Sequence, residues 1–89
     1  IIVWGTGRYA EETIDKSYLF KNSKVLFYVD KNFENNINHS IKGDIFDPSK
    51  IKNYNNPIFI ASSTYWHEIY KQIMDMGINK NRIINTMVI

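Results

Sequence analysis

The sequence contains no cysteine, which excludes a disulfide framework, a thiolate metal site and a cysteine nucleophile. It also lacks any apolar run approaching the roughly 18 residues that a membrane-spanning helix requires. The apolar start, Ile1 to Val3, has no basic flank and is followed closely by Gly5, which does not match a secretory signal peptide. We therefore expect a cytoplasmic protein without a membrane span.

An excess of charge of one sign is missing as well. Eleven lysine and arginine residues stand against nine aspartate and glutamate residues, which gives a formal charge of +2. The basic residues are scattered along the chain, and no run of five like charges occurs. Proteins that bind nucleic acid usually carry a clustered basic surface, so we expect no nucleic-acid partner.

The length of 89 residues is enough for one domain and too short for two. Hydrophobic residues make up 44% of the chain and charged residues 22%, which is typical of a folded globular protein. The first residue is not methionine, so we expect residues 1–89 to be one domain of a longer protein. Whether that protein forms a homo-oligomer is left open by the sequence.

Short apolar runs alternate with helical patterns along the chain. Unbroken apolar runs, which favour strands buried on both faces, occur at residues 1–4, 25–29 and 58–61, with weaker candidates at 41–46, 83–84 and 87–89. Helical patterns and start signals occur at residues 8–20, 47–52 and 66–76. The alternation predicts an α/β fold, namely a compact Rossmann-like three-layer α/β/α arrangement with a mostly parallel sheet of four to five strands.

Residues 5–10 read G-T-G-R-Y-A, a G-x-G-x-x-A motif that follows a predicted strand and opens a predicted helix. In such a turn the first glycine permits the tight bend and the second lets a pyrophosphate approach the backbone. Ala10 then allows the helix to pack close to the sheet, and the first helical amides point at the phosphates. The candidate cofactor-binding residues of this turn are Gly5, Thr6, Gly7, Arg8 and Tyr9.

Asp30 closes the second predicted strand, 23 residues after Gly7. An acidic side chain near that spacing accepts hydrogen bonds from ribose hydroxyls and repels a 2′-phosphate, which favours NAD or a nucleotide sugar over NADP. Lys31 beside it weakens that preference and is also a candidate binding residue. The alternative interpretation is that the glycines serve only a tight turn and that Asp30 only caps a strand end.

Three hydroxyl side chains follow the predicted strand at 58–61. Ser62 and Ser63 would lie at the same sheet edge as the glycine turn, where they are candidates for contact with ribose or with the second half of a ligand. Together with Thr64 they are also good helix-capping residues, and we favour that simpler interpretation because the next helix needs a cap there.

Catalytic and metal motifs are absent. The chain has no phosphate-loop lysine motif, no G-x-S-x-G elbow and no tyrosine followed four residues later by lysine. His67 and Glu68 begin an H-E-x-x-H pattern, but Lys71 takes the place of the last histidine, so we predict no metal site. No catalytic residue is assigned, and the domain alone is not expected to be catalytic.

Five stretches together resemble a compact Rossmann-like module found at the ends of bacterial surface-polysaccharide enzymes. Those enzymes include sugar-nucleotide epimerases and dehydratases, nucleotide-sugar acetyltransferases and FkbM-type methyltransferases. The stretches that carry the resemblance are residues 2–10, 29–32, 47–51, 60–63 and 77–84.

The resemblance implies a domain that binds NAD(P) or a nucleotide sugar and serves as a module of a larger cell-surface polysaccharide enzyme. Its partners would be that small molecule and the other domains of the parent enzyme. Two alternatives remain: an NAD-dependent oxidoreductase or epimerase fragment without its catalytic half, and a degenerate module that binds no ligand and serves domain assembly. Fold alone does not decide among them.

Overall fold

The computed structural model describes residues 1–7, 10, 24–35 and 43–84. In this part of the chain a single five-stranded sheet forms, and every neighbouring pair of strands is parallel. Its strands are β1 (Ile2–Trp4), β2 (Phe27–Val29), β3 (Ile45–Phe46), β4 (Ile58–Ile60) and β5 (Ile83–Ile84). The predicted α/β class with a parallel sheet of four to five strands is confirmed.

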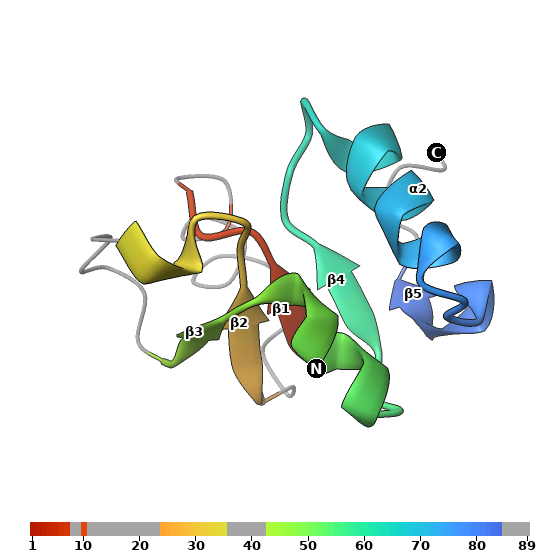
Figure 1. The fold of residues 1–89 in the computed structure, drawn as a ribbon, viewed down its shortest axis with the longest axis horizontal. Helices are drawn as coiled ribbons and strands as arrows, with labels where there is room; N and C mark the ends of the chain where they lie inside the picture. The colour runs from red at the N-terminus through yellow and green to blue at the C-terminus, as the bar shows by residue number, and fades with distance from the viewer. Residues whose placement is uncertain (8–9, 11–23, 36–42, 85–89) are drawn as a thin grey trace.

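The strand order is β3-β2-β1-β4-β5, so the chain begins in the middle of the sheet (Figure 1). From β1 it moves outward through β2 and β3, then returns to the other side of β1 and continues through β4 to β5. The direction of winding therefore changes between β1 and β4. In open parallel sheets ligands bind at the carboxyl ends of the strands at such a switch point. The register sets Trp4 opposite both Val29 and Ile60, so these three strands end together.

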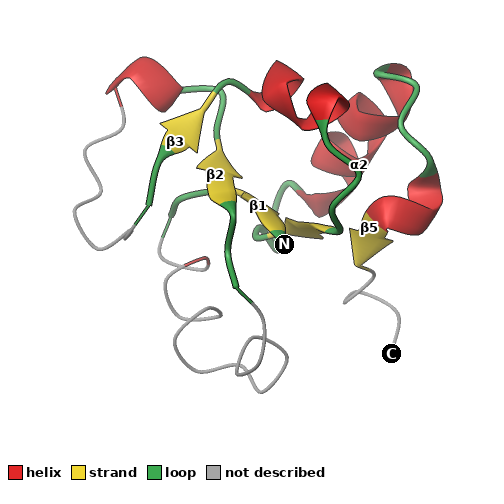
Figure 2. Cartoon of the chain, turned by 90° about the horizontal axis from the view of Figure 1, so that it is seen from below, coloured by secondary structure: helices red, strands yellow, loops and turns green. Residues whose placement is uncertain are grey.

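One face of the sheet is covered by the 3₁₀ helix η3 (Pro48–Asn53) and the helix α2 (Trp66–Asp75), which lie on the same side of the strands (Figure 2). The side chains alternate along each strand, as the pleat requires. Ile2, Phe27 and Ile58 point to this face and pack with buried residues of the two helices, among them Ile51 and Ile73. Burial on both faces explains why these strands read as unbroken apolar runs.

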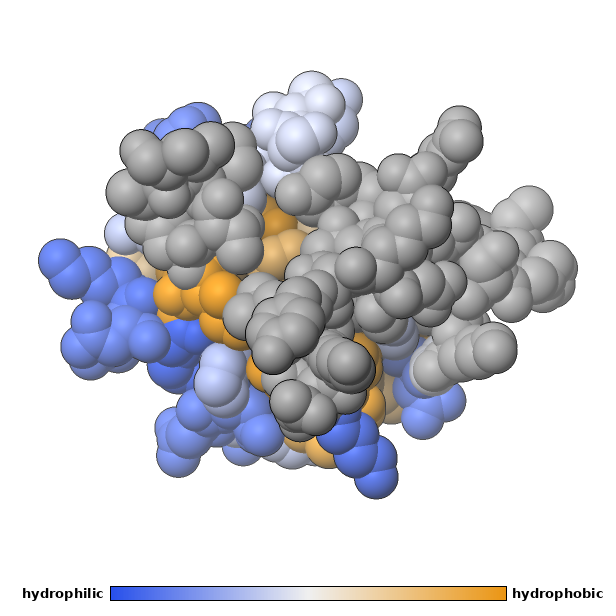
Figure 3. Space-filling view, turned by 180° about the vertical axis from the view of Figure 1, so that it is seen from behind, coloured by the Kyte–Doolittle hydropathy of each residue, from blue (hydrophilic) through white to orange (hydrophobic). Residues whose placement is uncertain are grey.

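The opposite face buries Val3, Tyr28 and Phe59 from three neighbouring strands. Ala10, which is helical, packs against them and is fully buried, as expected for the last position of the glycine motif. Apolar atoms of the described residues gather near the centre of this face (Figure 3). The remainder of the helix predicted at 8–20 lies outside the described residues, as do the predicted strand residues 41–42 and 87–89.

The helix α2 begins and ends near the predicted positions. Its apolar stripe of Trp66, Ile69 and Ile73 is buried against the sheet. Its C-cap is Met76, and Gly77 follows with a φ of +79°, a conformation that glycine adopts without strain and that commonly ends a helix. None of the helices among the described residues is long and apolar enough to cross a membrane.

Asp47 starts η3 as the sequence predicted, although the helix is 3₁₀ rather than α. One carboxylate oxygen of Asp47 accepts a hydrogen bond of 2.8 Å from the backbone N–H of Ser49, and Pro48 occupies the first helical position, where its missing N–H costs nothing. The bond favours the ionised carboxylate, so the pKa of Asp47 lies below its ordinary value of 3.8.

A depressed pKa makes this cap sensitive to acid. Its charge-dependent stabilisation is complete above the ordinary pKa and disappears as the pH falls through the lower, folded value. We expect Asp47→Ala to lower the melting temperature by a few degrees at neutral pH, and the difference from the wild type to shrink below pH 3.8. Thermal melts over a pH series measure this, and a difference that stays constant into acid would contradict it.

Candidate functional site

Gly5 lies where β1 ends and passes close to the end of β4. Its φ is +122°, and a Cβ atom built there would lie 2.7 Å from the carbonyl oxygen of Ala61. Two backbone hydrogen bonds hold the end of β1 close to its neighbours β2 and β4. The N–H of Gly5 donates to the carbonyl oxygen of Val29, and the N–H of Ala61 donates to the carbonyl oxygen of Trp4. The fold itself therefore requires glycine at this position, because any side chain would be strained and would clash with backbone.

Gly7 differs from Gly5 both in its backbone conformation and in the space around it. Its φ is outside the left-handed region, so alanine and larger residues are conformationally allowed. A Cβ atom added at Gly7 has nothing within 4 Å of it in the described structure. Local sterics in this part of the chain thus give no reason for a glycine. The open space is consistent with the sequence-based interpretation that a ligand approaches the backbone here.

Thr6, between the two glycines, joins this turn to the end of β2. Thr6 is buried, and its hydroxyl donates a hydrogen bond of 2.8 Å to one carboxylate oxygen of Asp30. The other oxygen accepts a bond of 2.9 Å from the backbone N–H of Asn32. These two bonds fix the orientation of the Asp30 carboxylate. Thr6 is therefore a positioning residue, and its bond shows that the glycine turn and Asp30, which the sequence pattern associated, lie side by side.

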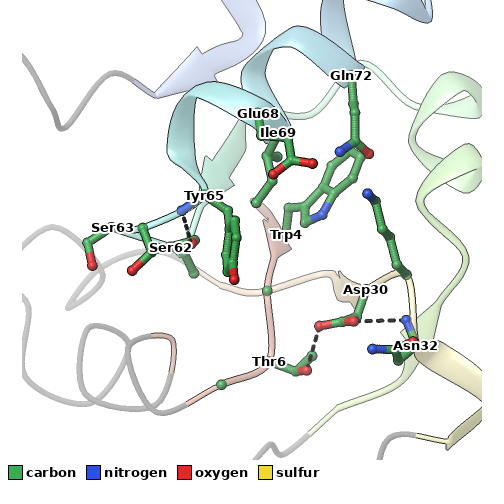
Figure 4. A pocket seen from close by; sticks show the side chains of 15 residues that line it. Trp4, Thr6, Asp30, Asn32, Ser62, Ser63, Tyr65, Glu68, Ile69 and Gln72 are labelled. Atoms are coloured by element: carbon green, nitrogen blue, oxygen red, sulfur yellow. Dashed lines mark hydrogen bonds between the residues drawn. The ribbon is translucent and has the colours of Figure 1, made fainter.

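A cleft of about 500 Å³ opens over the carboxyl ends of β1, β2 and β4 (Figure 4). This volume falls within the range of roughly 300–1,000 Å³ that is typical of small-molecule sites. Its floor includes the buried Trp4, whose indole lies between Asp30 and the α2 side of the cleft. The lining residues are 4–7, 30–32 and 61–65, with Glu68, Ile69 and Gln72 from α2. We refer to this feature as the switch-point cleft.

The switch-point cleft contains most of the predicted site residues. Gly5, Thr6, Gly7, Asp30, Lys31, Ser62 and Ser63 all line it. Arg8 and Tyr9 lie outside the described residues. The acidic and basic side chains of the described lining are the carboxylates of Asp30 and Glu68 and the ammonium group of Lys31. No group of three or more histidine and acidic side chains that could hold a metal ion occurs among residues of the described segments.

The serine-rich segment after β4 has a role slightly different from the predicted helix cap. The N-cap of α2 is Tyr65, which makes no capping hydrogen bond with its side chain. Ser62 acts one turn earlier: its hydroxyl oxygen accepts a bond of 3.0 Å from the backbone N–H of Tyr65. Ser62 thus shapes the bend that leads into α2, while Ser63 and Thr64 are exposed at the rim of the cleft.

The α2 side of the cleft was not predicted from the sequence. Tyr65, Glu68 and Gln72 face the cavity from the N-cap and the first two turns of the helix (Figure 4). Their spacing of three and four residues places them along one face of a helix, and this was visible in the sequence. The missing information was that this face, beside the buried stripe, looks toward the ends of β1 and β2.

A comparison with protein families matches residues 1–84 to the family described as "C2185-like, N-terminal". The chain belongs to this C2185-like N-terminal family. The match covers all five strands and every described residue of the switch-point cleft in this C2185-like domain. Searches among curated proteins and among solved structures found no match.

Proposed function

We propose that this C2185-like N-terminal domain binds a nucleotide-containing small molecule, NAD(P) or a nucleotide sugar, in the switch-point cleft. The observation that carries the proposal is the meeting of two features in one cavity. The open backbone at Gly7 and the fixed carboxylate of Asp30 both line a cleft that lies where the winding of the sheet reverses. A phosphate and an adjacent ribose need these two features at neighbouring strand ends.

Asp30 has the hydrogen-bonding capacity that a ribose requires. An ionised carboxylate offers about four acceptor positions, and the bonds from Thr6 and from the amide of Asn32 use one on each oxygen. Of the bonds made by the described residues, these two leave an acceptor position on each oxygen for a vicinal hydroxyl of the sugar. Because its orientation is fixed before binding, Asp30 loses little conformational entropy when a ligand arrives.

The phosphates would lie at the turn around Gly7, where no side chain of the described residues blocks the backbone. Lys31 lines the same cleft and supplies a positive charge beside Asp30. In this proposal Arg8, directly after the open glycine in sequence, contributes a second positive charge. The carboxylate of Asp30 disfavours a 2′-phosphate, which favours NAD or a nucleotide sugar over NADP.

The wider role that we propose is that of a nucleotide-binding module in a larger cytoplasmic enzyme of cell-surface polysaccharide synthesis. The family description, which names an N-terminal part, supports a module within a longer protein. The resemblance noted for residues 2–10 and 29–32 supports the link to sugar-nucleotide chemistry. Catalytic groups would come from other domains of that protein.

Thermal-shift and calorimetric titrations of the domain with NAD, NADP, UDP-glucose and ADP-glucose test the proposal. A ligand that binds only the folded state at a hundredfold excess over its Kd raises stability by about 2.7 kcal/mol. We expect at least one of these ligands to bind, and Asp30→Ala to weaken it about 10- to 100-fold, since hydrogen bonds to a charged group contribute about 1.5–3 kcal/mol.

The matched control is Asp47→Ala, which removes the same charge from an exposed aspartate that does not line the cleft. It is expected to leave the affinity unchanged. Absence of binding by all four ligands at millimolar concentration, or equal losses from both variants, would overturn the proposal. Absence of binding by all four ligands would favour the alternative of a degenerate module that binds no ligand and serves domain assembly.

A further inference from the structure

The α2 side of the switch-point cleft presents an aromatic ring, a carboxylate and an amide to the cavity. Tyr65, Glu68 and Gln72 supply these groups, and we call them the α2 wall. They lie across the cleft from Asp30, with the indole of Trp4 between the two sides (Figure 4). A ligand whose ribose contacts Asp30 and whose phosphates pass Gly7 would continue toward this wall.

The packing of the described part of the chain gives no reason for these residue types. The buried stripe of α2 consists of Trp66, Ile69 and Ile73, whereas Tyr65 is 61% exposed and Glu68 is exposed. Tyr65 is one of two large apolar side chains that are exposed among the described residues, and it alone of the two lines the cleft. An exposed aromatic ring at the edge of a cavity offers a surface that a ligand can cover.

The chemistry of the α2 wall matches a neutral, hydroxyl-rich group. The carboxylate of Glu68 accepts two or more hydrogen bonds, and the amide of Gln72 both donates and accepts, which suits the paired hydroxyls of a sugar. The negative face of the Tyr65 ring attracts the weakly positive C–H groups on one side of a pyranose. Glu68 disfavours a further phosphate or carboxylate at this position, because like charges repel.

We infer that the α2 wall is a glycosyl subsite, so that the ligand of the switch-point cleft is a nucleoside diphosphate linked to a neutral sugar rather than a dinucleotide. This inference rests on the proposed function and narrows it. Asp30 holds the ribose, the turn at Gly7 faces the diphosphate, and Tyr65 stacks on the sugar while Glu68 and Gln72 bond its hydroxyls.

Calorimetry with matched ligand pairs tests the glycosyl subsite. UDP-glucose is compared with UDP, and ADP-glucose with ADP, so that the choice of base does not decide the result. We expect the sugar to raise the affinity about 10-fold for the diphosphate that binds better. Tyr65→Ala should abolish that gain and leave the affinity for the diphosphate alone unchanged. UDP-glucuronic acid should bind the wild type more weakly than UDP-glucose, and Glu68→Gln should reduce this difference.

The control variant is Lys71→Ala, an exposed change on the same helix that does not line the cleft. Tyr65→Ala is suitable because the Tyr65 side chain is exposed and makes no capping bond. Equal affinity for the better-binding diphosphate and its glucose derivative, unaffected by Tyr65→Ala, would overturn the subsite and leave the proposed function standing. Tighter binding of NAD than of either sugar nucleotide would also overturn it. Absence of any binding would remove the proposed function and the subsite together.

Discussion

Replacing Gly5 with alanine is expected to lower the stability of the fold by about 2–4 kcal/mol. Two costs combine at this position. The φ of +122° is a conformation that residues with a side chain rarely adopt, and the new Cβ would lie 2.7 Å from the carbonyl oxygen of Ala61. That oxygen is backbone at the end of a central strand, so relief of the clash requires β1 and β4 to separate.

For a domain of this size a loss of 1 kcal/mol corresponds to about 4–8 °C in melting temperature. We therefore expect Gly5→Ala to melt at least roughly 10 °C below the wild type. Circular dichroism melts of the domain measure this directly. Gly7→Ala is the matched control, because its Cβ would have nothing within 4 Å in the described structure and its φ is allowed for alanine. Equal melting temperatures for the two variants would show that the close approach to Ala61 does not hold in solution.

The strands of the fold could be predicted from the sequence because burial on both faces leaves unbroken apolar runs. The runs at 25–29 and 58–61 contain β2 and β4, each trimmed to three residues. The lateral order of the strands was not predictable in the same way. It depends on which runs pair across long separations, such as Ile2 with both Phe27 and Ile58.

The glycine motif shows both the strength and the limit of sequence reasoning. The spacing correctly associated the turn with Asp30, and the bond from Thr6 confirms that they are neighbours. The motif assigned the tight bend to Gly5 and the ligand approach to Gly7, but it could not show that the packing of the described residues requires glycine at Gly5 and not at Gly7. That distinction depends on Ala61, which lies 56 positions further along the chain than Gly5 and meets it only through the pairing of β1 with β4.

The α2 side of the cleft was missed for a related reason. The apolar stripe in the sequence identifies the buried face of α2. The polar face that carries Tyr65 and Glu68 gives no such signal, because the polar face of a helix usually lies in solvent. Only the position of α2 beside the ends of β1 and β2 turns that face toward a cavity. Sequence motifs predicted the half of the candidate site that backbone geometry constrains, namely the glycine turn and Asp30. The other half, the exposed side chains of the α2 wall, could be found only from the three-dimensional structure.

Replacing Gly7 with valine is expected to weaken nucleotide binding roughly 100-fold, or about 2.8 kcal/mol, without destabilising the fold. The side chain would occupy space that nothing in the described structure fills, at the position where the proposed phosphates approach the backbone. In the proposed binding mode, loss of that approach would remove the phosphate contacts and displace the ribose from Asp30, so the effect should be at the upper end of that expected for Asp30→Ala.

Calorimetry with the best ligand of the screen measures the loss, and a melt without ligand checks the fold. Gly7→Ala should give an intermediate affinity, because a single methyl group blocks less of the backbone than an isopropyl group does. A wild-type affinity for Gly7→Val would place the phosphates elsewhere, and Gly7 would then be a glycine that neither the described packing nor the ligand requires. An affinity that falls stepwise from glycine through alanine to valine at residue 7, at a constant melting temperature, is expected only if the ligand contacts the backbone at this position.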